Sequence, residues 1–423
     1  MKEAFLHHIW NHKLLQQHSL RTFHGSSIEI IRFGQLNFHS GPDFLEAEIL
    51  IGKQLWIGSV EMHVNSSDWE LHRHSNDPAY HNVILHVVWN HDCEIDFLRQ
   101  RNVETLILQE FVAKEIVFNY NLILNNSVHY FPCEKMIKTI DFDKIKIWFD
   151  RLIIDRLELK SKGVLKLYEA THHNWEEVTF KLLAYNMGLK INADAFEQWS
   201  NSFPFQILQK NQFDPLRIYA LFFGQAGFLT ESMDDYMHSL KVEYEYIQHK
   251  YQLKPLSKSI FRFSSLRPPN FPSIRLAQLV SIYSQEKNLF SQLVSFDNQK
   301  DIELYFENFE PHIYWNTHFV FGKQSKSIVK RLSKSKIHQL IINWIIPLRL
   351  TYDLISDHLD MEWYLQLLES LKSEENRVIE NYQNAGVLIQ SAKDSQTILH
   401  LKKYYCDEKK CLNCAIGNEI LKS

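Results

Sequence analysis

The stretch FLEAEILIGKQLWIGSVEMHV, residues 44–64, has an apolar-rich segment on either side of a Gly-Lys pair, and side chains alternate along the second segment. A two-residue period is typical of a strand with one covered face, and Gly52-Lys53 suits a tight turn. The stretch therefore predicts two antiparallel strands, 44–51 and 54–64, joined in a hairpin.

The segments on both sides of this hairpin extend it into a mixed domain. Residues 3–15 carry apolar side chains near a 3.6-residue period, which predicts a helix, and residues 27–33 predict a further strand. Residues 65–81 are polar and predict a short helical crossover. Residues 82–89, NVILHVVW, are almost entirely apolar, as is typical of a central strand covered on both faces.

The apolar pattern changes near residue 140, beyond which a helical period prevails. We therefore predict an α+β fold, with an N-terminal mixed β-sheet followed by a long, mainly α-helical region. The expected domains are an α/β domain over residues 1–135 and a mainly helical domain over residues 136–423 that carries the C-terminal cysteines.

Composition narrows the class of protein. The formal net charge of −4 over 423 residues argues mildly against a general nucleic-acid coat protein, but it allows a local basic patch. No signal peptide is evident, and the most apolar stretch, 337–355, falls short of the roughly 20 apolar residues that span a membrane. We therefore expect a cytoplasmic protein without a membrane segment, and the sequence leaves its oligomeric state open.

Carboxylates and imidazoles gather in the N-terminal third, where 12 of the 22 histidines precede residue 92. In the strand 54–64, Glu61 and His63 point the same way because side chains alternate. Asp43, just before the partner strand, is delivered to the same end of the hairpin. Oxygen ligands converging at a strand end suit Mg²⁺ or Mn²⁺, so we predict that Asp43 and Glu61 bind the ion and that His63 acts on the attacking water.

Other polar residues are candidates for accessory roles. Asp68 and His72 share a face if the crossover is helical, and they could extend a metal site or contact phosphate, although ordinary surface positions explain them equally well. Arg267, Asn270 and Arg275 surround a proline-rich turn. They could bind an anion, or they could clamp helix ends and carbonyl groups.

The spacing of the candidate ligands resembles the motif of the PD-(D/E)XK nuclease superfamily: Pro42-Asp43, then 17 residues, then Glu61-Met62-His63. The predicted order of helix, three strands, helix and strand is similar to the core of that superfamily. The resemblance implies that Asp43 and Glu61 bind metal, that His63 replaces the catalytic lysine, and that Glu3 matches a carboxylate of the first helix. Because histidine stabilises charge less reliably than lysine, the replacement bears on activity more than on fold.

The chain as a whole also resembles a bacterial family known as domain of unknown function 2851, a resemblance that implies no activity. The similar stretches are GPDF at 41–44, GSVEMH at 58–63, SSDW at 66–69, LFFGQAGFL at 221–229, RPPNFPSIRLAQ at 267–278 and the C-terminal cysteine cluster.

The C-terminal cysteines Cys406, Cys411 and Cys414 have the spacing C-x4-C-x2-C. Three thiolates this close can chelate a metal ion, and Cys133 is the best candidate for the fourth ligand. Zinc or a [4Fe–4S] cluster would fit such a set. The alternative is three reduced thiols in a surface tail.

Three functions remain open at this point. The first is a metal-dependent nuclease-like phosphodiesterase acting on DNA or RNA. The second is a non-catalytic module that binds nucleic acid or protein and retains the fold. The third is a metal-dependent hydrolase of another substrate class. Basic surface around Asp43 and Glu61 would favour the first function over the third.

Overall fold

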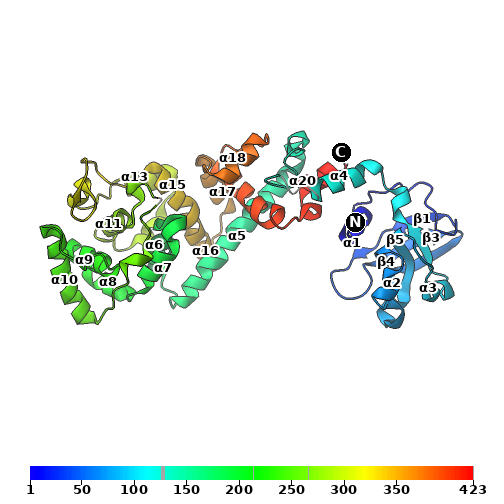
Figure 1. Cartoon of the computed structure of the whole chain (residues 1–423), viewed down its shortest axis with the longest axis horizontal. Coiled ribbons are helices and arrows are strands. Elements are labelled where there is room, and N and C mark those ends of the chain that lie inside the picture. Colours follow the sequence, from blue (N-terminus) through cyan, green and yellow to red (C-terminus); the bar gives the residue numbers. More distant parts are fainter. Residues whose placement is uncertain (125–128, 213, 265, 423) are drawn as a thin grey trace. The chain divides into compact units, whose positions relative to one another are not determined.

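The computed structural model describes residues 1–124, 129–212, 214–264 and 266–422 (Figure 1). The chain divides into two compact units, each assembled from more than one segment. The first unit comprises residues 1–148, 380–388 and 399–423, and the second comprises 149–379 and 389–398. The segment that carries the three C-terminal cysteines thus belongs to the unit that contains the sheet.

A mixed sheet in the strand order β1-β3-β4-β5-β6, with β2 paired to β3, forms the centre of the first unit (Figure 1). The pairs β1–β3, β2–β3 and β3–β4 are antiparallel, whereas β4–β5 and β5–β6 are parallel. The strands are β1 (Ile28–Arg32), β2 (Gln35–Leu36), β3 (Phe44–Ile51), β4 (Gln54–Asn65), β5 (Val83–Asn90) and β6 (Glu104–Ile107).

The β3–β4 hairpin sets the register that positions the site. Gly52 has φ +62° in the turn, a conformation that a residue without Cβ adopts at little cost. The pairing runs from Ile51 opposite Gln54 to Phe44 opposite Val60, with a bulge between Phe44 and Ala47. This register brings the residue before Phe44 beside Glu61.

Helices cover both faces of the sheet. On one face, Phe5 and Trp10 of α1 (Glu3–Asn11) lie near Trp89 of β5 and Phe44 of β3, with ring centroids 6.1 and 6.3 Å apart respectively. On the opposite face, buried Trp69 of α2 (Asp68–Leu71) lies 5.2 Å from the ring of His86. All of β5 except its last residue is buried, as the apolar run predicted.

The remaining helices of the first unit are short. They include α3 (Asp96–Gln100), α4 (Lys114–Leu124) and α20 (Ala415–Lys422), and the side-chain amide of Asn119 in α4 donates to the carbonyl of Ile420 in α20 at 3.0 Å. The segments that pass between the units carry α18 (Arg377–Asn384) and α19 (Ala392–Leu401).

The second unit is mainly helical and has one large apolar core. Its helices begin with α5 (Lys146–Ala170), whose first residues lie in the first unit, and continue with α6 (Trp175–Met187), α7 (Leu189–Asn201), α8 (Phe205–Asn211), α9 (Pro215–Gln225), α10 (Asp235–Tyr251), α11 (Pro272–Tyr283), α12 (Leu289–Ser295), α13 (Gln299–Glu307), α14 (Tyr314–Thr317), α15 (Lys334–Leu340), α16 (Ile346–Ser356) and α17 (Met361–Ser370). A two-stranded ribbon, β7 (His318–Val320) and β8 (Lys323–Gln324), interrupts them. In the parts of the chain that the structure describes, no helix is long and apolar enough to cross a membrane.

The predicted α+β class, a mixed N-terminal sheet followed by a mainly helical region, is confirmed. The first helix is shorter than the predicted 3–15, because α1 ends at Asn11 and Lys13 adopts φ +55°. Two strands, β2 and β6, were not predicted, since neither is long enough to establish a two-residue period.

Candidate metal centre

Backbone hydrogen bonds hold the carboxylates of Asp43 and Glu61 next to each other where β3 begins. The backbone N–H of Asp43 donates to Oε2 of Glu61 at 3.1 Å, and the backbone N–H of Met62 donates to Oδ2 of Asp43 at 2.9 Å. Each carboxylate therefore accepts a hydrogen bond from the strand that carries the other. This reciprocal arrangement fixes both side chains before any ligand binds.

Imidazoles surround the second oxygen of Glu61. Nε2 of His74 lies 3.2 Å and Nε2 of His63 lies 3.6 Å from Oε1 of Glu61. On its other side, His63 contacts the buried His86, with Nδ1 and Nε2 2.9 Å apart. Both Nε2 atoms near Glu61 are buried and lack a hydrogen-bond partner.

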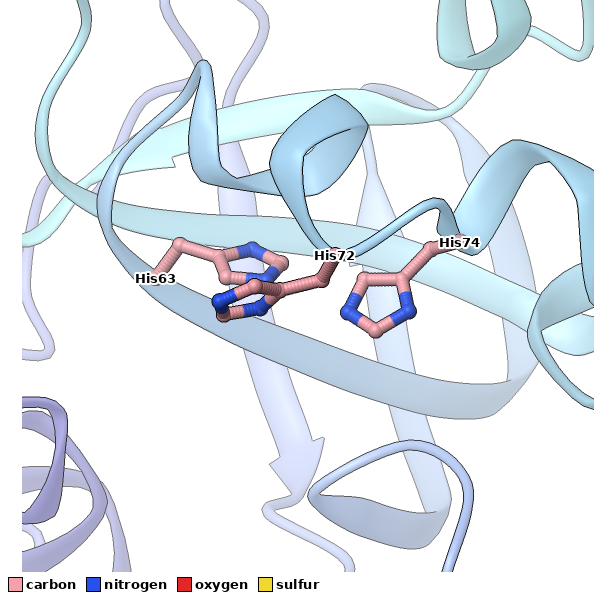
Figure 2. A group of neighbouring side chains, drawn as sticks. All are labelled: His63, His72 and His74. Atoms are coloured by element: carbon pink, nitrogen blue, oxygen red, sulfur yellow. The ribbon is translucent and has the colours of Figure 1, made fainter.

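The described residues include two groups of three potential ligands, and within each group the ligand atoms lie within 4.8 Å of one another. One group is His63, His72 and His74, and the other is Glu3, His7 and Asp43. Figure 2 shows the three imidazoles of the first group turned toward one another between β4 and the loop after α2. Their ring centroids are 5.2 to 5.5 Å apart.

The second group depends on helical spacing. Glu3 and His7 are one turn apart on α1, and Nε2 of His7 lies 3.1 Å from Oδ2 of Asp43. Glu61 links the two groups, because its Oε1 faces the imidazoles and its Oε2 faces the Asp43 backbone.

Burial and neighbouring ionisable groups shift the pKa values of the carboxyl and imidazole groups in this site. Burial first, and then the nearby Asp43 carboxylate, raise the pKa of Glu61 to about 9. Burial, with neighbouring histidines, lowers the pKa of His63 to about 2, and burial lowers that of His74. The pKa of His7 is raised: burial acts to lower it, but the hydrogen-bonding and charge of Asp43 prevail.

A cation would relieve this arrangement. Nε2 of a neutral imidazole is either an N–H, which can donate to Oε1 of Glu61, or a lone pair, which at 3.2–3.6 Å needs a proton or a metal ion between it and the carboxyl oxygen. Glu3, Asp43 and Glu61 offer oxygen ligands, and His63, His72 and His74 offer nitrogen ligands. Mixed oxygen and imidazole ligation suits Mn²⁺, Fe²⁺ or Zn²⁺ better than Mg²⁺, which prefers oxygen and water.

A pocket of about 790 Å³ adjoins this centre. His7, which contacts Asp43, is part of its lining, as are Lys2, Lys409 and Lys410, and Glu408 is the one carboxylate among the described residues that line it. The pocket is thus bounded by α1 and by the loop that carries the C-terminal cysteines.

The four predicted thiol ligands lie together in the first unit. Cys133, Cys406, Cys411 and Cys414 all line one small cavity. None of the five cysteines, all within the described residues, forms a disulfide, and Cys93 is exposed and lies outside this cavity.

Comparison with known protein families matches residues 3–377 to the family described as "Protein of unknown function (DUF2851)". The chain belongs to this family. Searches of curated proteins and of solved structures gave no match. The matched range includes Asp43, Glu61, His63 and Cys133, and it ends before the C-terminal cysteines.

Other predicted residues have different surroundings. Asp68 accepts the backbone N–H of Asn65 at 2.9 Å and so organises the start of the crossover. In the second unit, Arg275 is buried and bonds to Asn270 and Gln278, while Arg267 is exposed. The arginine of α11 thus bonds to the side-chain oxygens of two neighbouring residues.

Two residues of the candidate centre were missed or given little weight. His7 was overlooked, although its four-residue separation from Glu3 on a predicted helix puts both on one face. His74, in the polar crossover, reaches Glu61 through a turn at Arg73 with φ +61°, and this turn has no signature in the sequence.

Proposed function

We propose that the first unit is a metal-dependent, nuclease-like phosphodiesterase that acts on nucleic acid. The observation that carries the proposal is the pair Asp43 and Glu61, fixed by reciprocal backbone hydrogen bonds beside imidazole nitrogens that have no hydrogen-bond partner. Fixed oxygen ligands and unpartnered nitrogen lone pairs directed at one place are what a divalent metal ion requires.

The protein's own residues would hold the ion and set its geometry. Asp43 and Glu61 supply oxygen, and Nε2 of His63 supplies a nitrogen whose orientation is set by the contact of Nδ1 with His86. A bound divalent ion supplies Lewis acidity, which polarises a phosphoryl oxygen and activates water. We therefore assign His63 the role of ligand in place of the base that the sequence suggested.

The order of secondary structure agrees with the resemblance to the PD-(D/E)XK superfamily. The helix α1 precedes antiparallel β1, β3 and β4, and the crossover α2 leads to β5, which is parallel to β4. In this arrangement Asp43 precedes β3 and Glu61 lies within β4, the positions that the motif requires. This agreement supports a superfamily-like core.

The surroundings favour a phosphate-bearing substrate over another class of hydrolase substrate. Among the described residues that line the pocket next to His7, Lys2, Lys409 and Lys410 outnumber the one carboxylate, Glu408, to which Lys410 is paired. Local positive charge in a chain of net charge −4 is the expected footprint for a polyanion. Asparagines in the same lining add donors for phosphate or sugar oxygens.

The test is cleavage of single-stranded, double-stranded and branched DNA, and of RNA, by the purified full chain with Mn²⁺ or Mg²⁺. Asp43→Asn keeps the shape but removes ligand charge, so we expect turnover to fall at least about 100-fold. Asp96→Asn, at an exposed carboxylate in α3, is the matched control and should leave the rate unchanged.

The outcomes separate the competing functions. Cleavage undiminished in Asp43→Asn would assign the activity to a contaminant or another site. Nucleic-acid binding without cleavage, in a protein that takes up Mn²⁺, would support the non-catalytic module. Metal uptake without nucleic-acid binding would support a hydrolase of another substrate class.

A further inference from the structure

The C-terminal part of the first unit carries a second cluster of metal-ligand side chains, separate in chemistry from the carboxylate and histidine centre. Cys133 lies in the turn after Phe131-Pro132, whereas Cys406, Cys411 and Cys414 come from residues 399–423. More than 270 residues of chain separate Cys133 from Cys406, yet all four side chains line one cavity.

The local backbone is arranged around these sulfurs. Cys414 immediately precedes α20, and the N–H groups of Ile416 and Gly417 bond to its sulfur. Gly417 is required for this approach, because a Cβ there would lie 2.0 Å from the carbonyl oxygen of Cys411. These amide groups favour the thiolate, the form that binds metal, although burial prevails and raises the pKa of the Cys414 thiol to about 12.

The aromatic surroundings complete an enclosure. The hydroxyl of Tyr382 lies 3.1 Å from Sγ of Cys406, and its ring stacks on Phe131, with centroids 4.0 Å apart. Tyr382 is fully buried, and both rings belong to the first unit. The cluster therefore has a hydrogen-bonding neighbour and an apolar wall on one side, with Cys133 and Cys414 buried and Cys406 and Cys411 partly exposed.

We propose that Cys133, Cys406, Cys411 and Cys414 bind one metal centre through four thiolates, and that this centre is a [4Fe–4S] cluster. A single zinc ion with Zn–S bonds of about 2.3 Å holds tetrahedral sulfurs about 3.8 Å apart. No three of these four described sulfurs come within 4.8 Å of one another. The wider spacing fits a cluster whose four irons each bind one cysteine.

The centre would fasten residues 399–423 to the sheet-bearing part of the chain. The loop between Cys406 and Cys414 supplies Lys409, Lys410 and Leu412 to the wall of the 790 Å³ pocket beside His7. Closing so long a stretch of chain costs conformational entropy, which metal–thiolate bonds offset. The proposal is independent of the reaction at Asp43 and Glu61.

The experiment is anaerobic purification of the full chain, followed by iron, acid-labile sulfide and zinc analysis and a visible absorption spectrum. We expect about four irons and four sulfides per chain. Cys133→Ser should abolish this content, and Cys93→Ser, at the exposed cysteine, should retain it. Gly417→Ala removes no ligand but displaces the Cys411 carbonyl, so it should lower the iron content as well.

Circular dichroism of each variant distinguishes a lost centre from a lost fold. If Cys133→Ser proves insoluble, alkylation of the wild-type protein replaces it: the four cysteines should resist reagent until a chelator is added, while Cys93 reacts at once. One zinc per chain in place of iron would overturn the cluster and retain the four-thiolate site. Wild-type protein without iron or zinc, and with all five cysteines equally reactive, would overturn the whole proposal.

Discussion

Glu61→Gln should stabilise the metal-free protein while abolishing its metal binding. Glu61 is 4% exposed, and its pKa is about 9 in the folded state against 4.5 in an unfolded chain. Because the folded state favours the protonated carboxyl, the stability it contributes is complete below pH 4.5. That stability is lost as the pH rises through about 9.

The size of the stabilisation follows from the interval between the working pH and the pKa of Glu61 in the unfolded chain. At pH 7 the carboxyl is about 2.5 pH units above its unfolded pKa, and each unit corresponds to about 1.4 kcal/mol, so the pH-dependent loss is about 3 kcal/mol. Glutamine carries no charge, and its carbonyl can still accept the Asp43 N–H. For a domain of 150–250 residues the variant should therefore unfold roughly 6–12 °C higher in a chelator at pH 7.

The assay is thermal unfolding at pH 4.5, 7 and 9, with EDTA and then with excess Mn²⁺. The advantage of Glu61→Gln should vanish at pH 4.5. Metal at 100 times its Kd should stabilise the wild type by about 2.7 kcal/mol and leave the variant nearly unchanged. Glu29→Gln, at an exposed carboxylate in β1, is the control. A variant that melts below the wild type in EDTA at pH 7, or equal stabilisation of both by Mn²⁺, would refute the reasoning.

Two further substitutions test the centre and its frame. His63→Ala should lower both Mn²⁺ affinity, measured by isothermal titration, and turnover, measured by rate assays. His63→Lys should show the same two losses. If His63→Ala lost turnover at unchanged Mn²⁺ affinity, His63 would act as a base and not as a ligand. Gly58→Ala should destabilise the protein by about 1–3 kcal/mol in urea unfolding, because the added Cβ would lie 2.5 Å from both Asn82 O and Ile84 Cγ2. Gly163→Ala, whose Cβ meets no atom within 4 Å, is its control, and equal effects of both would contradict the packing argument.

The sequence was most informative where a two-residue period of apolar side chains lies next to a turn. The apolar-rich segments around Gly52-Lys53, the second of them alternating, predicted β3 with its observed bounds and β4 to within one residue. The same alternation placed Glu61 and His63 on one face, and the structure does bring Asp43 beside them. Local periodicity suffices here because the hairpin register depends on neighbouring residues alone.

Features that depend on distant parts of the chain were harder to predict from the sequence. Gly188 follows α6 at a position where a left-handed glycine often ends a helix, but it has φ −67°, and Leu189 adopts φ +53° instead. The tight approach of Asn192, whose carbonyl would lie 2.4 Å from a Cβ, explains the glycine. Likewise, no pattern in residues 399–423 indicates that they border a pocket with α1.

The first unit is built from separate segments of the chain, and this fixes the order in which its parts are synthesised. Residues 399–423 are synthesised after the whole helical segment that follows residue 148, a delay of roughly 10–50 s at ribosomal speeds of about 5–20 residues per second. During that interval the sheet can form, but Cys133 lacks its three partners and the pocket lacks one wall. The nascent chain thus holds the four cysteines apart until residues 399–423 have been made, so loading of the proposed four-thiolate centre would follow synthesis of the helical segment.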